Sequence, residues 1–288
     1  MDSRPRLLPR CTFPSEGAPL VCAVSGGPDS LALLALASAA GCVVTAIHVD
    51  HRLRAGSAAD ADVVAAAARR FGAVFEGRAA PVAPGPNLEA RARAARRDAL
   101  PAGAATGHTA DDQAETVLLN LLRGAGLDGL AGMRPGPGKP LLGLRRAETA
   151  ALCDELGLAP VCDETNRDPA FRRNRVRHEA LPLLDDVAGR DVVAVLARMA
   201  AVLGEDRDLL DELSASVDPV DAGALRAAPL PLARRAIRRL LADPYPPDAA
   251  AVERVLGVAR QEAVGCEVAG GARVRRSGDR LHVERPDA

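Results

Sequence analysis

The sequence predicts an α/β fold in which a parallel sheet is covered by helices on both faces and is followed by a smaller, mainly helical domain. From Leu20 to about Leu158, short apolar runs alternate with stretches of helical periodicity, which indicates strands joined by crossover helices. After about Leu184 the strand-like runs stop, and the segment 191–216 has apolar residues at helical spacing. The chain of 288 residues is long enough for two such domains.

The first domain, residues 19–185, is predicted to have a Rossmann-like arrangement of strands and helices. We expect strands at Leu20–Val24, Val43–His48, Val74–Arg78 and Ala104–Gly107, with a fifth at Pro140–Leu142. We expect helices at 29–40, 57–71, 87–100, 110–123 and 146–157. Because right-handed crossovers bring the carboxyl ends of all parallel strands to one edge, a ligand is expected to bind there.

The segments outside this domain carry weaker signals. Residues 1–18 are interrupted by prolines and lack the apolar core of a secretory signal, so we expect a flexible leader. The apolar segment 31–49 is long enough to span a bilayer, but Gly41 separates an alanine/leucine helix from a β-branched strand, and we predict no membrane span. In the second domain, 186–288, the alternation within 270–284 predicts a C-terminal hairpin.

Composition excludes some classes of site. The formal net charge of −1 argues against a uniformly basic nucleic-acid coat, so a polyanion would have to meet a local patch. Lys139 is the only lysine. The six cysteines include no C-x-x-C pair, which argues against a zinc knuckle, an iron–sulfur ligand set or a disulfide framework. We expect reduced cysteines and a cytoplasmic location.

The turn after the first strand, VCAVSGGPDS, is the strongest local signal for a ligand. Its two glycines let a ligand approach the backbone, the proline fits the first turn of a helix, and the last serine is expected to turn its hydroxyl toward the same cleft. Free N–H groups at a helix N-terminus favour a phosphate group. A lone Gly-Gly would more often be an ordinary tight turn. The predicted phosphate-binding residues are Ser25, Gly26, Gly27, Pro28, Asp29 and Ser30.

Two other predicted elements carry charged residues, one at the end of a strand and one along a helix. Asp50 and His51 stand at the carboxyl end of the second strand, beside this loop, although such a trio with His48 is more often a solvated turn. Arg93 and Arg96 occupy the helix 87–100, whose four arginines would by themselves indicate a solvated face.

The segment TGHTADDQAET places three functional groups together. His108 ends the fourth strand, Asp111 is expected to cap the next helix, and Asp112 and Glu115 follow His108 at spacings of four and seven. This spacing points His108, Asp112 and Glu115 to one side, into the cleft. Acids at the start of a helix also compensate its dipole, and spacing alone leaves that alternative about equally weighted.

These motifs resemble those of the ATP pyrophosphatase (PP-loop) family, whose members split ATP between the α and β phosphates. The string S-G-G-x-D-S matches the family's pyrophosphate loop, and HVDHRLR (48–54) is nearly identical to a string in its tRNA-modifying branch. The family pattern A-R-x-x-R-Y is matched at 92–97 with Arg97 in place of tyrosine. The segment 107–116 is very similar to that of tRNA(Ile)-lysidine synthetases, with Gly107 in place of alanine.

A fourth segment, 161–184, resembles another string of the same branch. It aligns on Asp163, Asn166, Asp168, Arg173, Asn174, Arg177 and Pro182. Together with Arg172 and Arg175, its arginines form a dense positive patch where a tRNA backbone would cross between the domains.

The resemblance implies that ATP, with Mg²⁺, adenylylates the wobble cytidine in the CAU anticodon of tRNA(Ile), and that free L-lysine then displaces AMP. By this resemblance the loop residues, Asp50 and His51 hold the nucleotide, Asp29 and His108 support adenylylation, and Asp112 and Glu115 hold the lysine. Substrate contacts are assigned to Arg93, Arg96, Arg173, Asn174 and Arg177, and the second domain to tRNA recognition. The metal ligands are not predicted.

Three alternatives remain at the level of the sequence. A tRNA thiolase of this superfamily would share the phosphate loop but would need cysteines near the cleft. A small-molecule amide ligase would not need a tRNA. A non-catalytic nucleotide-binding module would not need the arginine patch within 163–182.

Overall fold

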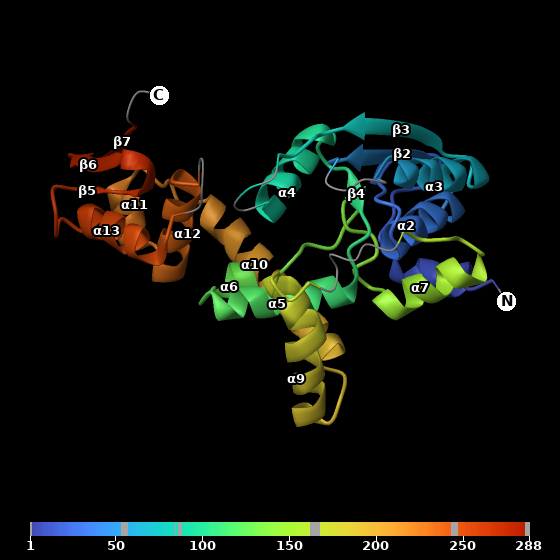
Figure 1. The fold of residues 1–288 in the computed structure, drawn as a ribbon. Coiled ribbons are helices and arrows are strands. Elements are labelled where there is room, and N and C mark those ends of the chain that lie inside the picture. Colours follow the sequence, from blue (N-terminus) through green and yellow to red (C-terminus); the bar gives the residue numbers. More distant parts are fainter. Residues whose placement is uncertain are drawn as a thin grey trace. The chain divides into compact units, whose positions relative to one another are not determined.

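The computed structural model describes residues 2–52, 57–83, 85, 88–161, 168–242 and 247–285, and Figure 1 shows its fold. By its internal contacts the chain divides into two compact units, Met1–Val202 and Leu203–Ala288. The division falls inside one helix, α10 (Val192–Ala215). Where the catalytic domain ends, placed at residue 185 from the sequence, stays a prediction because a division by contacts does not test it.

The first unit contains a four-stranded parallel sheet in the order β3–β2–β1–β4. Its strands are β1 (Pro19–Ala23), β2 (Val43–Asp50), β3 (Val74–Ala79) and β4 (Ala105–Thr106). Cys22 of β1 pairs with Ala46 on one side and with Ala105 on the other. The strand order therefore reverses beside β1, and ligands of open α/β sheets bind at such a reversal.

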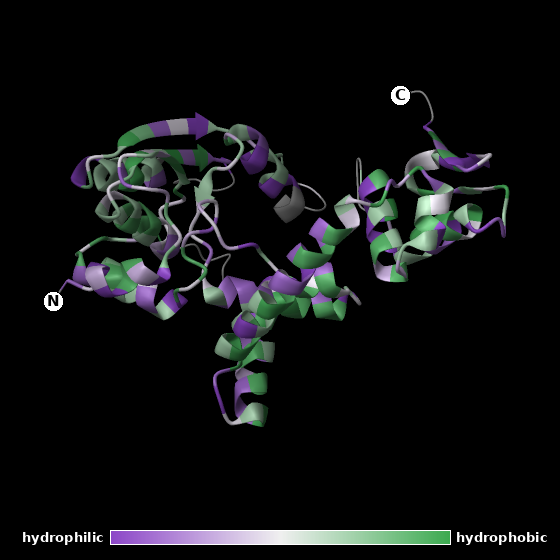
Figure 2. Ribbon diagram, turned by 180° about the vertical axis from the view of Figure 1, so that it is seen from behind, coloured by the Kyte–Doolittle hydropathy of each residue, from purple (hydrophilic) through white to green (hydrophobic). Residues whose placement is uncertain are grey.

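Helices surround this sheet, and the predicted α/β class is confirmed. α2 packs against β1, β2 and α7, and α3 packs against β2 and β3. The edge strand β3 carries both hydrophilic and hydrophobic residues, as Figure 2 shows. The helical elements of the unit are α1 (Arg4–Leu7), the 3₁₀ turn η1 (Leu8–Arg10), α2 (Pro28–Ala39), α3 (Ser57–Arg70), α4 (Leu88–Ala99), α5 (Ala110–Leu122), α6 (Leu127–Leu130), α7 (Arg146–Glu155), α8 (Arg172–Arg175), the π-helical turn η3 (Val176–Ala180) and α9 (Leu181–Ala188).

The interpretation of 31–49 as helix, turn and strand is confirmed. Residues 31–37 of α2 are fully buried, which means that neighbouring elements cover this helix on every side. A helix covered in this way is apolar all round. Gly41, with φ of +79°, makes the turn into β2. No described helix combines the length and the apolar character that crossing a membrane requires.

Two predictions about the first unit are wrong. Residues 140–143 form turns and not a fifth strand, because Leu141 and Leu144 bury their side chains in the core from an irregular segment. The predicted flexible leader is also packed in part. Leu7 is buried in the core beneath the sheet, and Arg10 donates a 2.9 Å hydrogen bond to Glu148.

The second unit has its own core and a small antiparallel sheet. The predicted hairpin is confirmed as β6 and β7, and a third strand, β5, pairs with β6. Ile237, Val255 and Val274 are fully buried at its centre. Besides the end of α10, its elements are α11 (Ala222–Ala227), α12 (Leu230–Leu240), α13 (Ala249–Ala259), β5 (Gly265–Glu267), the 3₁₀ turn η4 (Ala269–Gly271), β6 (Arg273–Ser277) and β7 (Arg280–Glu284).

Candidate active site

The loop between β1 and α2 is a tight turn that needs its glycines. Gly26 has φ of +89°, and a Cβ there would lie 2.8 Å from Cγ2 of Val161. Gly27 is the N-cap of α2, and Pro28 occupies the first turn as predicted. The loop thus presents the N-terminus of a helix, where N–H groups and the helix dipole favour an anion.

The side chain of Ser30 forms hydrogen bonds with two backbone groups of this loop. Its hydroxyl donates to the carbonyl oxygen of Gly27 at 2.8 Å and accepts from the backbone N–H of Ser25 at 3.2 Å. The side chain is buried. The hydroxyl thus satisfies the loop's own backbone groups, and the expectation that Ser30 turns it toward the cleft stays a prediction.

The end of β4 packs directly on the same loop. A Cβ on Gly107 would lie 2.6 Å from the carbonyl oxygen of Asp29, which is too close for two heavy atoms that are not bonded. Because the obstructing atom belongs to the backbone, it could not swing away as a flexible side chain would. Gly107 thus allows the segment that carries His108 to touch the phosphate loop.

Replacing Gly107 by alanine is expected to displace the loop. The free energy of unfolding should fall by about 1–3 kcal/mol, the usual cost of overpacking, and the affinity for ATP should fall with it. Urea denaturation and ATP titration measure the two effects. Gly126→Ala is the matched control, since a Cβ at Gly126 meets no atom within 4 Å. Equal stability and ATP affinity in the two variants would contradict the expectation.

The first turn of α5 holds Asp112 in a fixed position. Thr109 is the N-cap, and its backbone N–H and hydroxyl both donate to Oδ2 of Asp112, at 2.9 and 3.1 Å. Asp111 does not cap the helix, contrary to prediction. It accepts from the backbone N–H of Arg146 at 2.8 Å and from the guanidinium of Arg145. The second oxygen of Asp112, Oδ1, is left for other partners.

Three arginines surround Asp112 and the completely buried Glu115. Glu115 lies 3.1 Å from Arg146 and 2.7 Å from both Arg173 and Arg177. Oδ1 of Asp112 is 2.9 Å from Arg146 and 3.5 Å from Arg173. We call these five residues the arginine–acid cluster.

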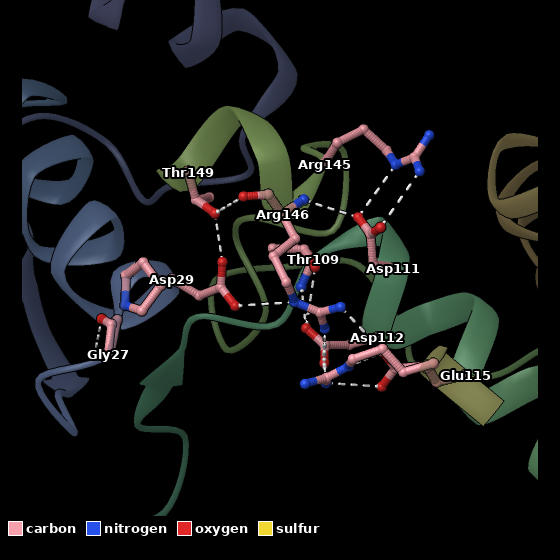
Figure 3. A network of polar contacts seen from close by, with 12 residues as sticks. Gly27, Asp29, Thr109, Asp111, Asp112, Glu115, Arg145, Arg146 and Thr149 are labelled. Atoms are coloured by element: carbon pink, nitrogen blue, oxygen red, sulfur yellow. Dashed lines mark hydrogen bonds and ion pairs between the residues drawn. The ribbon is translucent and has the colours of Figure 1, made fainter. Parts of the chain in front are cut away.

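Arg146 connects this cluster with the phosphate loop. Its Nε lies 3.6 Å from Oδ2 of Asp29, while its two terminal nitrogens reach Asp112 and Glu115. The hydroxyl of Thr149, one turn further along α7, donates to Oδ1 of Asp29. Figure 3 shows Arg146 lying between Asp29 and the two acids. The phosphate loop and the acids thus share one neighbour.

The acids and the arginine of the site shift the pKa values of one another. Burial raises the pKa of Asp29, and the Thr149 hydrogen bond and Arg146 offset part of that rise. Burial also acts to raise the pKa of Asp112, but Arg146, the Thr109 N–H and Arg173 outweigh it and hold this pKa below its usual value. The pKa of Arg146 lies above its usual value despite burial, because acids surround it. Asp112 and Arg146 are therefore charged at neutral pH.

His108 lies in a positive part of the site. Its Nδ1 is 2.7 Å from the hydroxyl oxygen of Thr106, which is 2.6 Å from Nζ of Lys139. Burial, together with the charges of Lys139, Arg173 and Arg93, lowers the pKa of His108 to about 4 against the opposing effect of Asp112. The imidazole is therefore neutral at neutral pH.

The remaining predicted residues lie on neighbouring elements. Asp50 ends β2 and His51 follows it; Asp50 accepts from the backbone N–H of Arg52, and Nδ1 of His51 is 3.0 Å from the carbonyl oxygen of Ala80. Arg93 and Arg96 lie on α4.

The arginines of the segment 172–177 make two kinds of contact. Arg173 and Arg177 face Glu115, whereas Arg175 is exposed and pairs with Glu179. The side-chain amide of Asn174 donates to the carbonyl oxygen of Asp168, and this residue lines a hollow of about 310 Å³. The motif positions 163 and 166 lie outside the described residues.

Sequence reasoning missed Arg146 and Thr149 and gave Lys139 no role. One signal was available for Arg146, because a cation in the first turn of a helix opposes the helix dipole and so needs acidic partners. The spacing of Arg173 and Arg177 was also informative. It puts both side chains on one face of a helix, where they can contact the same acid.

Comparisons with known proteins show the family of the chain. A family profile described as PP-loop domain matches residues 7–184. A tRNA(Ile)-lysidine synthase of Nocardia farcinica is 46% identical over 248 residues, which are 80% of this chain and 78% of that protein. A namesake from Mycobacterium tuberculosis is 44% identical over 235 residues, which are 75% of this chain and 72% of that protein.

The chain belongs to the tRNA(Ile)-lysidine synthase family. Beyond this family, a solved U34-tRNA thiolase, NcsA from Methanococcus maripaludis with its [4Fe-4S] cluster, shares the fold. That match has a TM-score of 0.55 at 17% identity and covers 70% of this chain and 79% of the thiolase. The resemblance to this family that the sequence indicated is confirmed.

Proposed function

We propose that this protein uses ATP to attach L-lysine to carbon 2 of the wobble cytidine in the CAU anticodon of tRNA(Ile), in the cytoplasm. The observation that carries the proposal is the match to relatives named for this product over three quarters or more of the chain. The geometry supports it, because a phosphate loop and a pair of acids lie on two sides of Arg146.

The reaction has two steps. In the first, the oxygen on carbon 2 of the cytidine attacks the α-phosphorus of ATP, and the bond to pyrophosphate breaks. In the second, the ε-amine of lysine, after losing a proton, attacks carbon 2. The carbon–oxygen bond then breaks, and AMP leaves with that oxygen. Both steps need a cation or N–H group near a phosphate oxygen, and the second also needs an acidic side chain near the amine of lysine.

The loop 25–30 is suited to the phosphates and the arginine–acid cluster to lysine. Lysine carries an ammonium and a carboxylate, and the cluster offers partners for both. Its acids would attract the ε-ammonium, and its guanidiniums would attract the carboxylate. Because Glu115 already contacts three arginines, lysine must replace at least one of these contacts to reach this acid.

This arrangement changes the expected role of the arginine segment. Arg173 was expected to bind the tRNA backbone, but its side chain faces Glu115 and is only 23% exposed. We therefore assign Arg173 and Arg177 to the lysine step. The exposed Arg172 and Arg175 are better placed to meet phosphates of the tRNA.

The glycine loop suits ATP, because it leads into the N-terminus of α2, where Gly27 is the N-cap and the helix dipole favours an anion. Magnesium ions that accompany ATP are held mainly by phosphates and by one or two carboxylates. Asp29 is the carboxylate of the loop. Within the described ranges no three His, Cys, Asp or Glu side chains converge on a point where a metal could sit. Mg²⁺ is therefore proposed as a companion of ATP, and no step is assigned to it.

Labelled lysine provides the test. Incubated with ATP and tRNA(Ile) carrying CAU, the protein should transfer lysine to the tRNA and form one AMP and one pyrophosphate for each lysine. The same tRNA with uridine at the wobble position is the control and should accept none. Pyrophosphate exchange that proceeds without tRNA would instead indicate a small-molecule ligase. Sulfur incorporation would indicate a thiolase, and ATP binding without turnover a non-catalytic module.

A further inference from the structure

Lys139 is held against the end of β4 by a short turn. Its backbone N–H donates to the carbonyl oxygen of Gly136 at 2.8 Å, and the backbone N–H of Thr106 donates to the carbonyl oxygen of Gly138 at 3.1 Å. These bonds bring Nζ of Lys139 to 2.6 Å from Oγ1 of Thr106 and 3.3 Å from Nδ1 of His108. The sole lysine of an arginine-rich chain is thus fixed beside the functional histidine.

The direction of each hydrogen bond in this group follows from the donors available. An ammonium has three donors and no acceptor, so Lys139 donates to the Thr106 hydroxyl oxygen. The single hydrogen of that hydroxyl is then directed at Nδ1 of His108, its nearest remaining acceptor at 2.7 Å, since the carbonyl oxygen of Gly138 is 3.3 Å away. Nδ1 therefore accepts, and in a neutral ring the proton must sit on Nε2.

Two other histidines have the opposite arrangement. Nδ1 of His48 is 2.9 Å from the carbonyl oxygen of Val24, and Nδ1 of His51 is 3.0 Å from that of Ala80. A carbonyl oxygen only accepts, so these two rings carry a proton on Nδ1. The arrangement around His108 therefore differs from that of His48 and His51.

We propose that Lys139, acting through the Thr106 hydroxyl, is a positioning residue that holds His108 in its Nε2–H form, so that His108 donates a hydrogen bond and does not accept a proton. The role in catalysis rests on the proposed function, since such a donor would stabilise an oxygen that gains negative charge during adenylyl transfer. The assignment of the tautomer does not rest on it. A lysine suits the position because its ammonium is a compact point charge on a flexible stem.

Nitrogen NMR of the full chain tests the proposal directly. The protein contains only five histidines, so ¹⁵N-labelled imidazole rings can be followed one by one in long-range proton–nitrogen correlations. At about pH 8.5, where an ordinary imidazole is neutral, His108 should show Nε2–H and both His48 and His51 Nδ1–H. His108→Gln identifies the His108 signals by their loss.

Variants of the two relay residues test the mechanism. In Lys139→Met the Thr106 hydroxyl becomes free to accept, so the His108 signals should move toward the Nδ1–H form. Thr106→Ser keeps the hydroxyl and should leave the tautomer unchanged. Thr106→Val still leaves Nζ of Lys139 as a donor 3.3 Å from Nδ1, so the double variant Lys139→Met/Thr106→Val, which removes both groups, should shift the His108 signals furthest. Unchanged signals of His48 and His51 serve as the check that the fold is intact.

Adenylylation supplies a second, separate readout. In Lys139→Met the rate of tRNA-dependent pyrophosphate exchange should fall about 10- to 100-fold, the usual effect of losing a group that orients a functional side chain, while the KM for lysine stays the same. A wild-type His108 with Nδ1–H, or a tautomer unaffected in both Lys139→Met and the double variant Lys139→Met/Thr106→Val, overturns the proposal. If the tautomers are as expected but no lysine is transferred, the proposed function fails and the positioning role stands.

Discussion

Replacing Glu115 by glutamine is expected to lower the free energy of unfolding by about 3–5 kcal/mol, the usual cost of removing one partner from a buried ion pair. Glutamine keeps the size of the side chain but removes the charge that faces Arg146, Arg173 and Arg177. These guanidiniums would then be only partly compensated by the remaining acids. Urea denaturation followed by circular dichroism measures the change.

Glu205→Gln is the matched control for this variant. Glu205 is exposed on α10, so the same substitution should change stability by no more than about 0.5 kcal/mol. Adding Arg177→Met to Glu115→Gln removes one uncompensated cation and should recover part of the loss, which a double-mutant cycle measures. A Glu115→Gln protein as stable as the Glu205→Gln control would show that the arginine–acid cluster does not stabilise the fold.

Replacing Arg146 by methionine is expected to slow lysidine formation by about 100- to 1000-fold, as the loss of one well-placed donor does in other active sites. Arg146 alone among the described residues contacts Asp29, Asp112 and Glu115, so its loss separates the phosphate loop from the pair of acids proposed to bind lysine. Single-turnover assays should show that adenylylation and lysine transfer are both slowed.

The neighbouring Arg145 offers the control. Its guanidinium pairs with Asp111 and Asp191 and has no described contact with Asp29 or Glu115. Arg145→Met should therefore reduce the rate less than 10-fold, by the scale of a surface ion pair. Equal rates for Arg145→Met and Arg146→Met would remove Arg146 from the mechanism and leave it a structural role.

Local pattern was sufficient for most of the fold. The four strands and the helices around them were predicted because each has its own periodicity and a glycine or proline at its end. The segment 140–143 was wrongly predicted as a strand. Leu141 and Leu144 are buried from a turn, and their side chains give the same apolar run in the sequence as a strand would. Local pattern was also insufficient for the N-terminal segment. There the single buried side chain of Leu7, in a short helix, holds a segment whose prolines suggested a flexible leader.

The residues of the candidate site divide along the same line. The loop 25–30 and the acids of α5 were predicted because each lies within one continuous motif. Arg146 was not predicted, because its partners at positions 29, 112 and 115 are far away in the chain and only the tertiary fold brings them together. Ser30 and Asp111 were placed in the right region, but competing partners in the backbone decided where their polar atoms point.

The pairing of β1 directly with β4 has a consequence for how the protein matures during synthesis. β1 ends at Ala23, but its partner strand begins at Ala105, and Arg173 and Arg177 are translated later still. Contacts between segments so distant in sequence form slowly, because a long stretch of chain must be ordered before they close. A nascent chain on the ribosome that has emerged only as far as α5 would expose Glu115 without its arginine partners.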